Sequence, residues 1–144
     1  MADKAGIRSF SGRYQFLSNF FPCLVIYEGV AYSSAEHAFQ AAKTLSIPGR
    51  GYVAQARRPG EAKRRGRAVV LRSDWEEVKE AVMLGVLRSK FEDEDLRRQL
   101  VETGDAELIE GNTWGDRYWG VDQRQGLNRL GMLLMHLREE ITGG

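Results

Sequence analysis

Glu36, Gln40 and Lys43 bring a carboxylate, an amide and an amine together at helical spacing. Steps of four and three residues place them on one face of an α-helix. Ser33 stands three residues before Glu36, the spacing of a capping box, so the sequence predicts a helix with Glu36 in its first turn. Such a stripe can orient water, stabilise a positive charge or, through a desolvated amine, attack an electrophile. It also fits a solvated helix face.

The segment before this helix is aromatic and carries a small polar pair. Residues 17–21 read LSNFF, so Ser18 and Asn19 stand next to Phe20 and Phe21. Buried polar groups cost free energy unless they are paired, and this pair is therefore expected to bond either backbone or a ligand. Asn19 and Gln40 are suited to orient hydroxyl groups or to read a base edge.

A second aromatic segment spans residues 111–126 and reads GNTWGDRYWGVDQRQG. The indoles of Trp114 and Trp119 can stack on a nucleobase, and glycines such as Gly120 permit close backbone approach to a ligand. Asp116 is a candidate second acid among these aromatics. In the alternative interpretation the indoles cover the core and Asp116 provides turn chemistry.

Length and composition predict one compact domain over residues 1–144, with 42% hydrophobic residues for its core. No apolar run approaches the roughly 20 residues of a membrane span, and the N-terminus lacks the apolar block of a signal peptide, so we expect a cytoplasmic protein without a membrane partner. Cys23 is the only cysteine and the two histidines are far apart, so neither a metal site nor a cofactor is predicted. The sequence leaves the oligomeric state open.

The net charge of +1 hides an uneven distribution. Residues 43–72 carry nine basic residues and one acidic residue, whereas residues 73–111 carry five basic and twelve acidic residues. The basic stretch fits either solvated surface or contact with phosphate groups, including those of a nucleic acid.

The pattern of residues predicts a mainly helical α+β fold with a small β-hairpin. Residues 24–27 and 30–32 read as the hairpin around Glu28 and Gly29. Helices are expected at 35–45, 52–57, 59–65, 75–91, 95–102 and 128–141, with a loop at 48–51 and a brief strand at 108–109. Ser73 and Glu76 repeat the capping-box spacing at the start of the helix at 75–91.

These motifs, taken in order, resemble those of the YbiA-like, or NADAR, family of N-glycosidases. The matching pieces are LSNF at 17–20, YSSAEH at 32–37, QAAK at 40–43, RSDW at 72–75, DRYWG at 116–120 and GLNRLGMLLM at 126–135. Each motif alone is weak, but the ordered set covers the chain from about Phe10 to Arg138.

The resemblance implies the roles of individual residues. It implies that Glu36, Lys43 and Asp116 are catalytic. It implies a functional role for Trp75 as well. Together with the local patterns described above, the predicted substrate-binding set comprises Ser18, Asn19, Phe20, His37, Gln40, Trp75, Trp119 and Gly120. For Trp75, packing in the core is the alternative interpretation.

The function implied is hydrolysis of a bond between a base and ribose. Two substrates fit: ADP-ribose attached to guanine in a nucleoside or nucleic acid, which the basic stretch favours, and the phosphorylated ribosylaminopyrimidine of riboflavin biosynthesis. A module that binds ADP-ribose or a related nucleotide without cleaving it is the alternative from another class.

Overall fold

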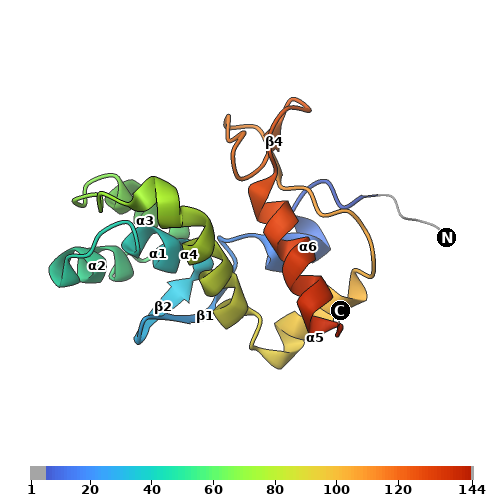
Figure 1. Cartoon of the computed structure of the whole chain (residues 1–144), viewed down its shortest axis with the longest axis horizontal. Helices are drawn as coiled ribbons and strands as arrows, with labels where there is room; N and C mark the ends of the chain where they lie inside the picture. Colours follow the sequence, from blue (N-terminus) through green and yellow to red (C-terminus); the bar gives the residue numbers. More distant parts are fainter. Residues whose placement is uncertain (1–5, 144) are drawn as a thin grey trace. The chain divides into compact units, whose positions relative to one another are not determined.

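The computed structural model describes residues 6–143, which divide into two compact units. Unit 1 contains residues 6–18 and 93–143, and unit 2 contains residues 19–92. Figure 1 labels the helices and strands of both units. The prediction of one domain over residues 1–144 stays a prediction.

Unit 2 begins with an antiparallel hairpin, followed by four helices. The hairpin consists of β1 (Pro22–Tyr27) and β2 (Val30–Ser34), and its turn residues Glu28 and Gly29 have φ angles of 49° and 82°. Left-handed conformations at both turn positions match the right-handed twist of the strands, which confirms the predicted hairpin. The helices are α1 (Ala35–Ala41), α2 (Ile47–Ala54), α3 (Pro59–Gly66) and α4 (Trp75–Lys90).

Helix α1 lies at the centre of unit 2, where it packs against α2, α3, α4 and both strands of the hairpin (Figure 1). Its alanines explain how so many elements can approach it. Ala35, Ala38 and Ala41 are completely buried, and their small side chains leave room for neighbouring backbones. The polar residues of α1 are therefore surrounded by protein.

The predicted start and end of this helix are each corrected. Strand β2 continues through Ser34, so Ser34 rather than Ser33 caps α1, and its hydroxyl accepts from the His37 backbone N–H at 3.1 Å. The helix ends at Ala41 instead of residue 45, because the next backbone N–H groups, those of Lys43 and Thr44, bond to carbonyls only three residues back.

Two other boundaries also differ from the prediction. The expected loop at 48–51 belongs to α2, since Ser46 caps the helix through the Gly49 N–H and proline is tolerated in a first turn. The expected capping box at Ser73 and Glu76 does not form. Helix α4 follows Asp74 without a side-chain cap, and Glu76 pairs with Lys79.

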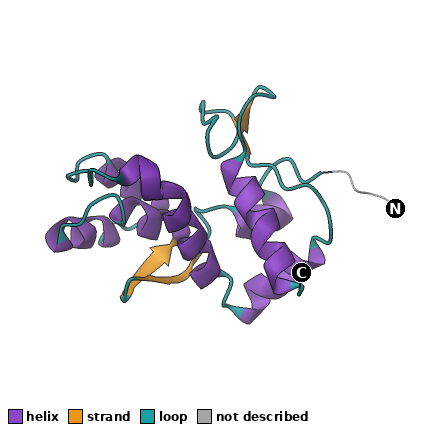
Figure 2. Cartoon of the chain, viewed as in Figure 1, coloured by secondary structure: helices purple, strands orange, loops and turns teal. Residues whose placement is uncertain are grey.

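Unit 1 holds a 3-10 helix, η1 (Gly12–Leu17), two α-helices, α5 (Glu94–Glu102) and α6 (Arg129–Ile141), and two short parallel strands, β3 (Gly111–Asn112) and β4 (Val121–Asp122) (Figure 2). The strand expected at 108–109 is wrong: Leu108 makes an isolated bridge with Ile7. Leu100, Leu130 and Leu134 are among the buried residues of this unit.

The mainly helical fold with a small β-hairpin is confirmed across the described residues. The helices in this part of the chain include none long and apolar enough to cross a membrane.

Lys90, at the end of α4, is a charged side chain in the interior of unit 2. It is completely buried, and its Nζ lies 5.3 Å from the centre of the Phe91 ring and 5.9 Å from that of Phe21. Burial lowers the pKa of Lys90 to about 8, although the nearby Cys23 opposes this shift. The charged form of Lys90 is therefore disfavoured by folding.

This burial predicts that the protein becomes more stable as the pH rises from about 8 to about 10. Over that range the unfolded chain keeps a proton on Lys90 that the folded chain releases, so the unfolded state binds more protons. The expected gain in the free energy of unfolding is on the order of 2 kcal/mol. Urea unfolding at several pH values measures it. Lys90→Met should remove most of this dependence, and an unchanged slope in that variant would contradict the assignment to Lys90.

Candidate active site

The two polar side chains of α1 that the sequence placed on one face are in contact. Gln40 Nε2 donates to Glu36 Oε2 at 2.6 Å, and the two residues are only 4% and 8% exposed. Burial raises the pKa of the Glu36 carboxyl, while the bond from Gln40 and the charges of Lys63 and Lys43 oppose the rise. Glu36 is thus a buried carboxyl that keeps its proton to a higher pH than an exposed glutamate does.

Lys43 lies just beyond the last residue of α1, in the turn that ends the helix. Its Nζ is 6.0 Å from the centre of the Phe39 ring. Burial lowers the pKa of Lys43, the charges of Arg67 and Lys63 lower it further, and Glu36 opposes the shift. A lowered pKa increases the fraction of neutral amine, which is the nucleophilic form.

Trp75 lies near the end of α1 because hydrogen bonds of Arg72 hold the start of α4 against it. The backbone N–H of Arg72 donates to the Lys43 carbonyl at 2.7 Å, and its guanidinium donates to Asp74 at 2.7 and 3.2 Å. The rings of Trp75 and Phe39 then lie 5.1 Å apart at 57°. Trp75 is only 6% exposed, so it forms part of the apolar surroundings of the turn.

Asn19 is hydrogen-bonded to α1 through its backbone. Its backbone carbonyl accepts from the Glu36 N–H at 3.0 Å, and its side-chain amide lies 3.5 Å from Met83 Sδ. Among the residues that the structure describes, the Asn19 and Gln40 side-chain oxygens are buried acceptors without a donor. Such atoms are costly unless a ligand or water supplies the missing hydrogen bond. Phe20, the next residue, is 44% exposed.

His37 is held by protein on both sides of its ring. Nε2 lies 2.9 Å from the Ala56 carbonyl, which can only accept, so Nε2 carries a proton; Nδ1 lies 2.7 Å from the Ser34 hydroxyl. The ring is 1% exposed. His37 was predicted to bind substrate, but both of its ring nitrogens contact other groups of the protein.

The other implied site residues belong to unit 1. Ser18 follows η1 and its N–H donates to the Gln15 carbonyl at 2.9 Å. Asp116 Oδ1 accepts from the backbone N–H groups of Tyr118 and Trp119 at 3.1 and 2.9 Å. This is the turn chemistry that the sequence offered as the alternative for Asp116.

The loop that carries Asp116 is shaped by its own polar groups. Asn112 donates to the Asp116 carbonyl at 2.9 Å and accepts from the Asp116 N–H at 3.1 Å. Gly120 is buried, and a Cβ there would overlap the Glu110 side chain and carbonyl, so only glycine fits. Trp119 stacks edge-on against Tyr118 at 4.9 Å.

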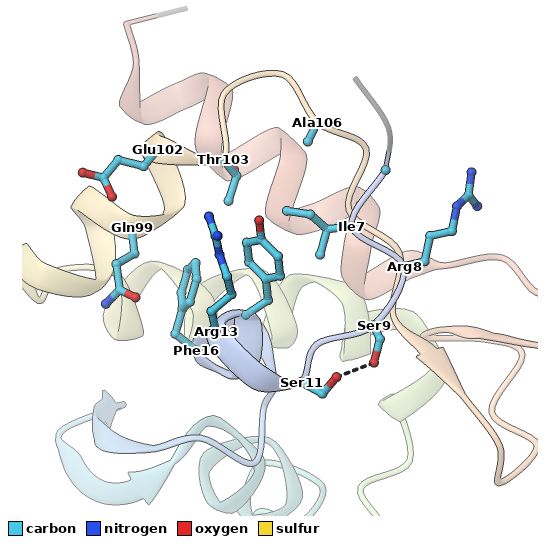
Figure 3. Close-up of a pocket in the computed structure, with 12 residues that line it drawn as sticks. Ile7, Arg8, Ser9, Ser11, Arg13, Phe16, Gln99, Glu102, Thr103 and Ala106 are labelled. Atoms are coloured by element: carbon cyan, nitrogen blue, oxygen red, sulfur yellow. Dashed lines mark hydrogen bonds between the residues drawn. The ribbon is translucent and has the colours of Figure 1, made fainter. Parts of the chain in front are cut away.

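Unit 1 also contains a cavity of about 780 Å³. In Figure 3 the Arg13 side chain stands beside Phe16 and extends into the cavity toward Thr103. The implied catalytic and substrate-binding residues are not among those that line this cavity.

Sequence reasoning missed three residues at the Glu36 site. Gly66 of α3 lies so close to Gln40 that a Cβ there would overlap Gln40 Oε1, and Lys63 acts electrostatically on both Glu36 and Lys43. Arg72 sets the approach of α4. The sequence showed Lys63 in the basic stretch and in a piece that fits the family, but it gave Lys63 no role at Glu36, because local spacing does not show that α3 packs against α1. Within the described residues, no three or more His, Cys, Asp and Glu side chains gather as a metal site would require.

Comparisons with known proteins show which family the chain resembles. The NADAR domain matches residues 7–142. The chain is 42% identical over 138 residues to N-glycosidase YbiA of Escherichia coli, covering 93% of this chain and 86% of that protein. It is 36% identical over 130 residues to Riboflavin biosynthesis protein VVA0006 of Vibrio vulnificus, covering 88% of this chain and 35% of that protein. The NMR structure of E. coli YbiA superposes with a TM-score of 0.87 at 38% identity, over 99% of this chain and 88% of that one. With the match extending over nearly all of its residues, the chain belongs to the NADAR family.

Proposed function

We propose that this N-glycosidase removes ADP-ribose from guanine bases, in a nucleoside or in nucleic acid. The observation that carries the proposal is a pair of groups with shifted pKa values, the buried Glu36 on α1 and the half-buried Lys43 just beyond it. Burial raises the pKa of Glu36 and lowers that of Lys43, so both groups can change protonation nearer to neutral pH. Groups shifted in this way within an aromatic cluster suit acid–base or covalent chemistry better than binding alone.

Glu36 fits the demands of N-glycosidic cleavage. As the bond to the base breaks, positive charge builds on the ribose ring and negative charge on the leaving base. An ionised Glu36 beside the anomeric carbon would stabilise the ring or orient the attacking water, and Gln40 holds its carboxylate in place. The second acid remains Asp116 by family resemblance, and its role is a prediction.

Lys43 offers a covalent route to the same product. Its neutral amine would attack C1′ of the ribose while the C1′–N bond to the base breaks, and opening of the ring would give an imine that water hydrolyses. In the alternative route Lys43 stays charged, supports the ionised form of Glu36, and water attacks directly.

The buried acceptors and the basic surface support a ribosylated, phosphate-bearing substrate. The unpartnered oxygens of Asn19 and Gln40 can accept from ribose hydroxyls or from a base N–H. Arg57, Arg58 and Arg64 lie exposed on or next to α3, where they can meet the phosphates of a nucleic acid.

A second substrate deserves a direct comparison, because relatives carry riboflavin biosynthesis in their names. It is the phosphorylated ribosylaminopyrimidine of that pathway. The experiment incubates the protein with ADP-ribosylated guanosine, ADP-ribosylated guanine DNA and the ribosylaminopyrimidine phosphate, side by side, and measures free base. Rapid release from the first two supports the proposal, and release from the third alone moves the function to riboflavin chemistry. Binding of ADP-ribose without any release would indicate a binding module.

A further inference from the structure

Helix α3 presents a tightly packed face to α1. Ala62 and Gly66, one turn apart, are buried, and the Gly66 backbone touches the Gln40 side chain. Since Gln40 is bonded to Glu36, this face of α3 forms a wall of the Glu36 site. Residues beside Gly66 on α3 are therefore close to the reacting groups.

Two cationic residues flank this contact. Lys63 stands one turn before Gly66 and is half-buried, and Arg67 follows Gly66 directly and is exposed. The charge of Lys63 acts on both Glu36 and Lys43, and the charge of Arg67 acts on Lys43. Lys63 therefore acts on both the carboxylate and the amine of the site, and Arg67 acts on the amine.

The other side of α3 differs, because its charge is balanced within the protein. Arg65 donates to Glu61 at 2.8 Å and to the Tyr52 carbonyl at 2.7 Å, and it lies 4.5 Å above the Tyr52 ring. Arg67 has no carboxylate partner in the part of the chain that the structure describes. An excess of positive charge at a partly buried site favours an anionic ligand with more than one negative charge.

We propose that Lys63 and Arg67 form a phosphate subsite, which holds the phosphate or diphosphate attached to the ribose and so places the anomeric carbon at Glu36. The inference rests on the proposed function, since it names the part of the substrate that this site reads. Lys63 supplies a point charge and Arg67 a planar donor pair, both of which suit phosphate oxygens. The subsite serves a ribose 5-phosphate and an ADP-ribose diphosphate alike.

Direct binding tests the subsite apart from turnover. Calorimetry measures the affinity of the wild-type protein for ribose 5-phosphate, ADP-ribose and unphosphorylated ribose. Lys63→Gln and Arg67→Gln should each weaken binding of the two phosphorylated probes by about 10- to 100-fold. Arg88→Gln removes the same charge from an exposed position of α4 in the same unit and should leave binding of these small probes unchanged.

Kinetics adds a readout that a structural role would not move. On the substrate that releases base, Lys63→Gln and Arg67→Gln should each raise KM, and this rise in KM should vanish when the substrate lacks its phosphate. Equal losses in Arg88→Gln, or unchanged affinity in both subsite variants, would overturn the subsite while leaving the N-glycosidase intact. Absence of base release from every substrate, with phosphate-dependent binding retained, would instead contradict the proposed function. A preference for ribose 5-phosphate over ADP-ribose would assign the subsite to a monophosphate.

Discussion

Glu36→Gln is expected to lower kcat by roughly 100- to 10⁴-fold, the usual contribution of a positioned acid–base group, while the fold and ligand affinity persist. The substitution keeps the shape of the side chain, and the new amide can still bond to Gln40, so the packing of α1 should survive. It removes the negative charge that would stabilise the ribose ring in the transition state. Single-turnover release of base, with circular dichroism as the check on folding, measures the effect.

Glu77→Gln is the matched control, because Glu77 is an exposed glutamate of α4 in the same unit. Its activity should equal that of the wild type. Activity of Glu36→Gln within a few fold of the wild type would contradict a catalytic role for the buried carboxyl. If Glu36→Gln does not fold, its circular dichroism spectrum will show it. Glu36→Asp, which keeps the charge but shortens the side chain, would then provide the test.

Lys43→Arg is expected to lower kcat by about 10³-fold or more and to abolish covalent trapping. Arginine keeps the positive charge but is not a usable nucleophile. In the wild type, borohydride added during turnover should reduce the imine between Nζ and C1′ to a stable secondary amine, after the base has left. Peptide mass spectrometry should find the ribosyl adduct at Lys43.

The pH dependence separates the two roles of Lys43. Attack needs the neutral amine, so in the imine route kcat rises with pH until the pH exceeds the pKa of Lys43, which burial lowers. If Lys43 acts only through its charge, kcat falls over the same range. Full activity of Lys43→Arg, with no adduct in the wild type, would assign Lys43 to electrostatics and leave water as the nucleophile.

The sequence predicted elements that depend on local patterns and missed those that depend on distant contacts. Glu36 and Gln40 meet as their spacing on α1 requires, and the turn of Glu28 and Gly29 forms the expected hairpin. The cap moved from Ser33 to Ser34 because pairing of β2 with β1 extends the strand by one residue, which the capping-box spacing alone could not reveal.

The contacts of Arg72 and Gly66 at the site depend on which helices pack against each other. Arg72 lies thirty residues from the carbonyl of Ala42 that its guanidinium contacts at 3.4 Å, and Gly66 is fixed by the side chain of Gln40 on another helix. Neither contact has a signature in composition or periodicity. The aromatic segment itself indicated Asp116 and Trp119, whereas family resemblance supplied the role of Trp75. For Asp116 the structure adds its bonds to the loop backbone.

Hydrolysis in water labelled with heavy oxygen shows whether this chain breaks the bond between a base and ribose. ADP-ribosylated guanosine and the ribosylaminopyrimidine phosphate are each incubated with the protein, and the products are weighed by mass spectrometry. Product ribose kept in labelled water without protein corrects for spontaneous exchange at C1′. The account predicts label on the ribosyl product and none on the released base, by either route through Lys43. Label in the base or in phosphate, or no cleavage of either substrate, would contradict it.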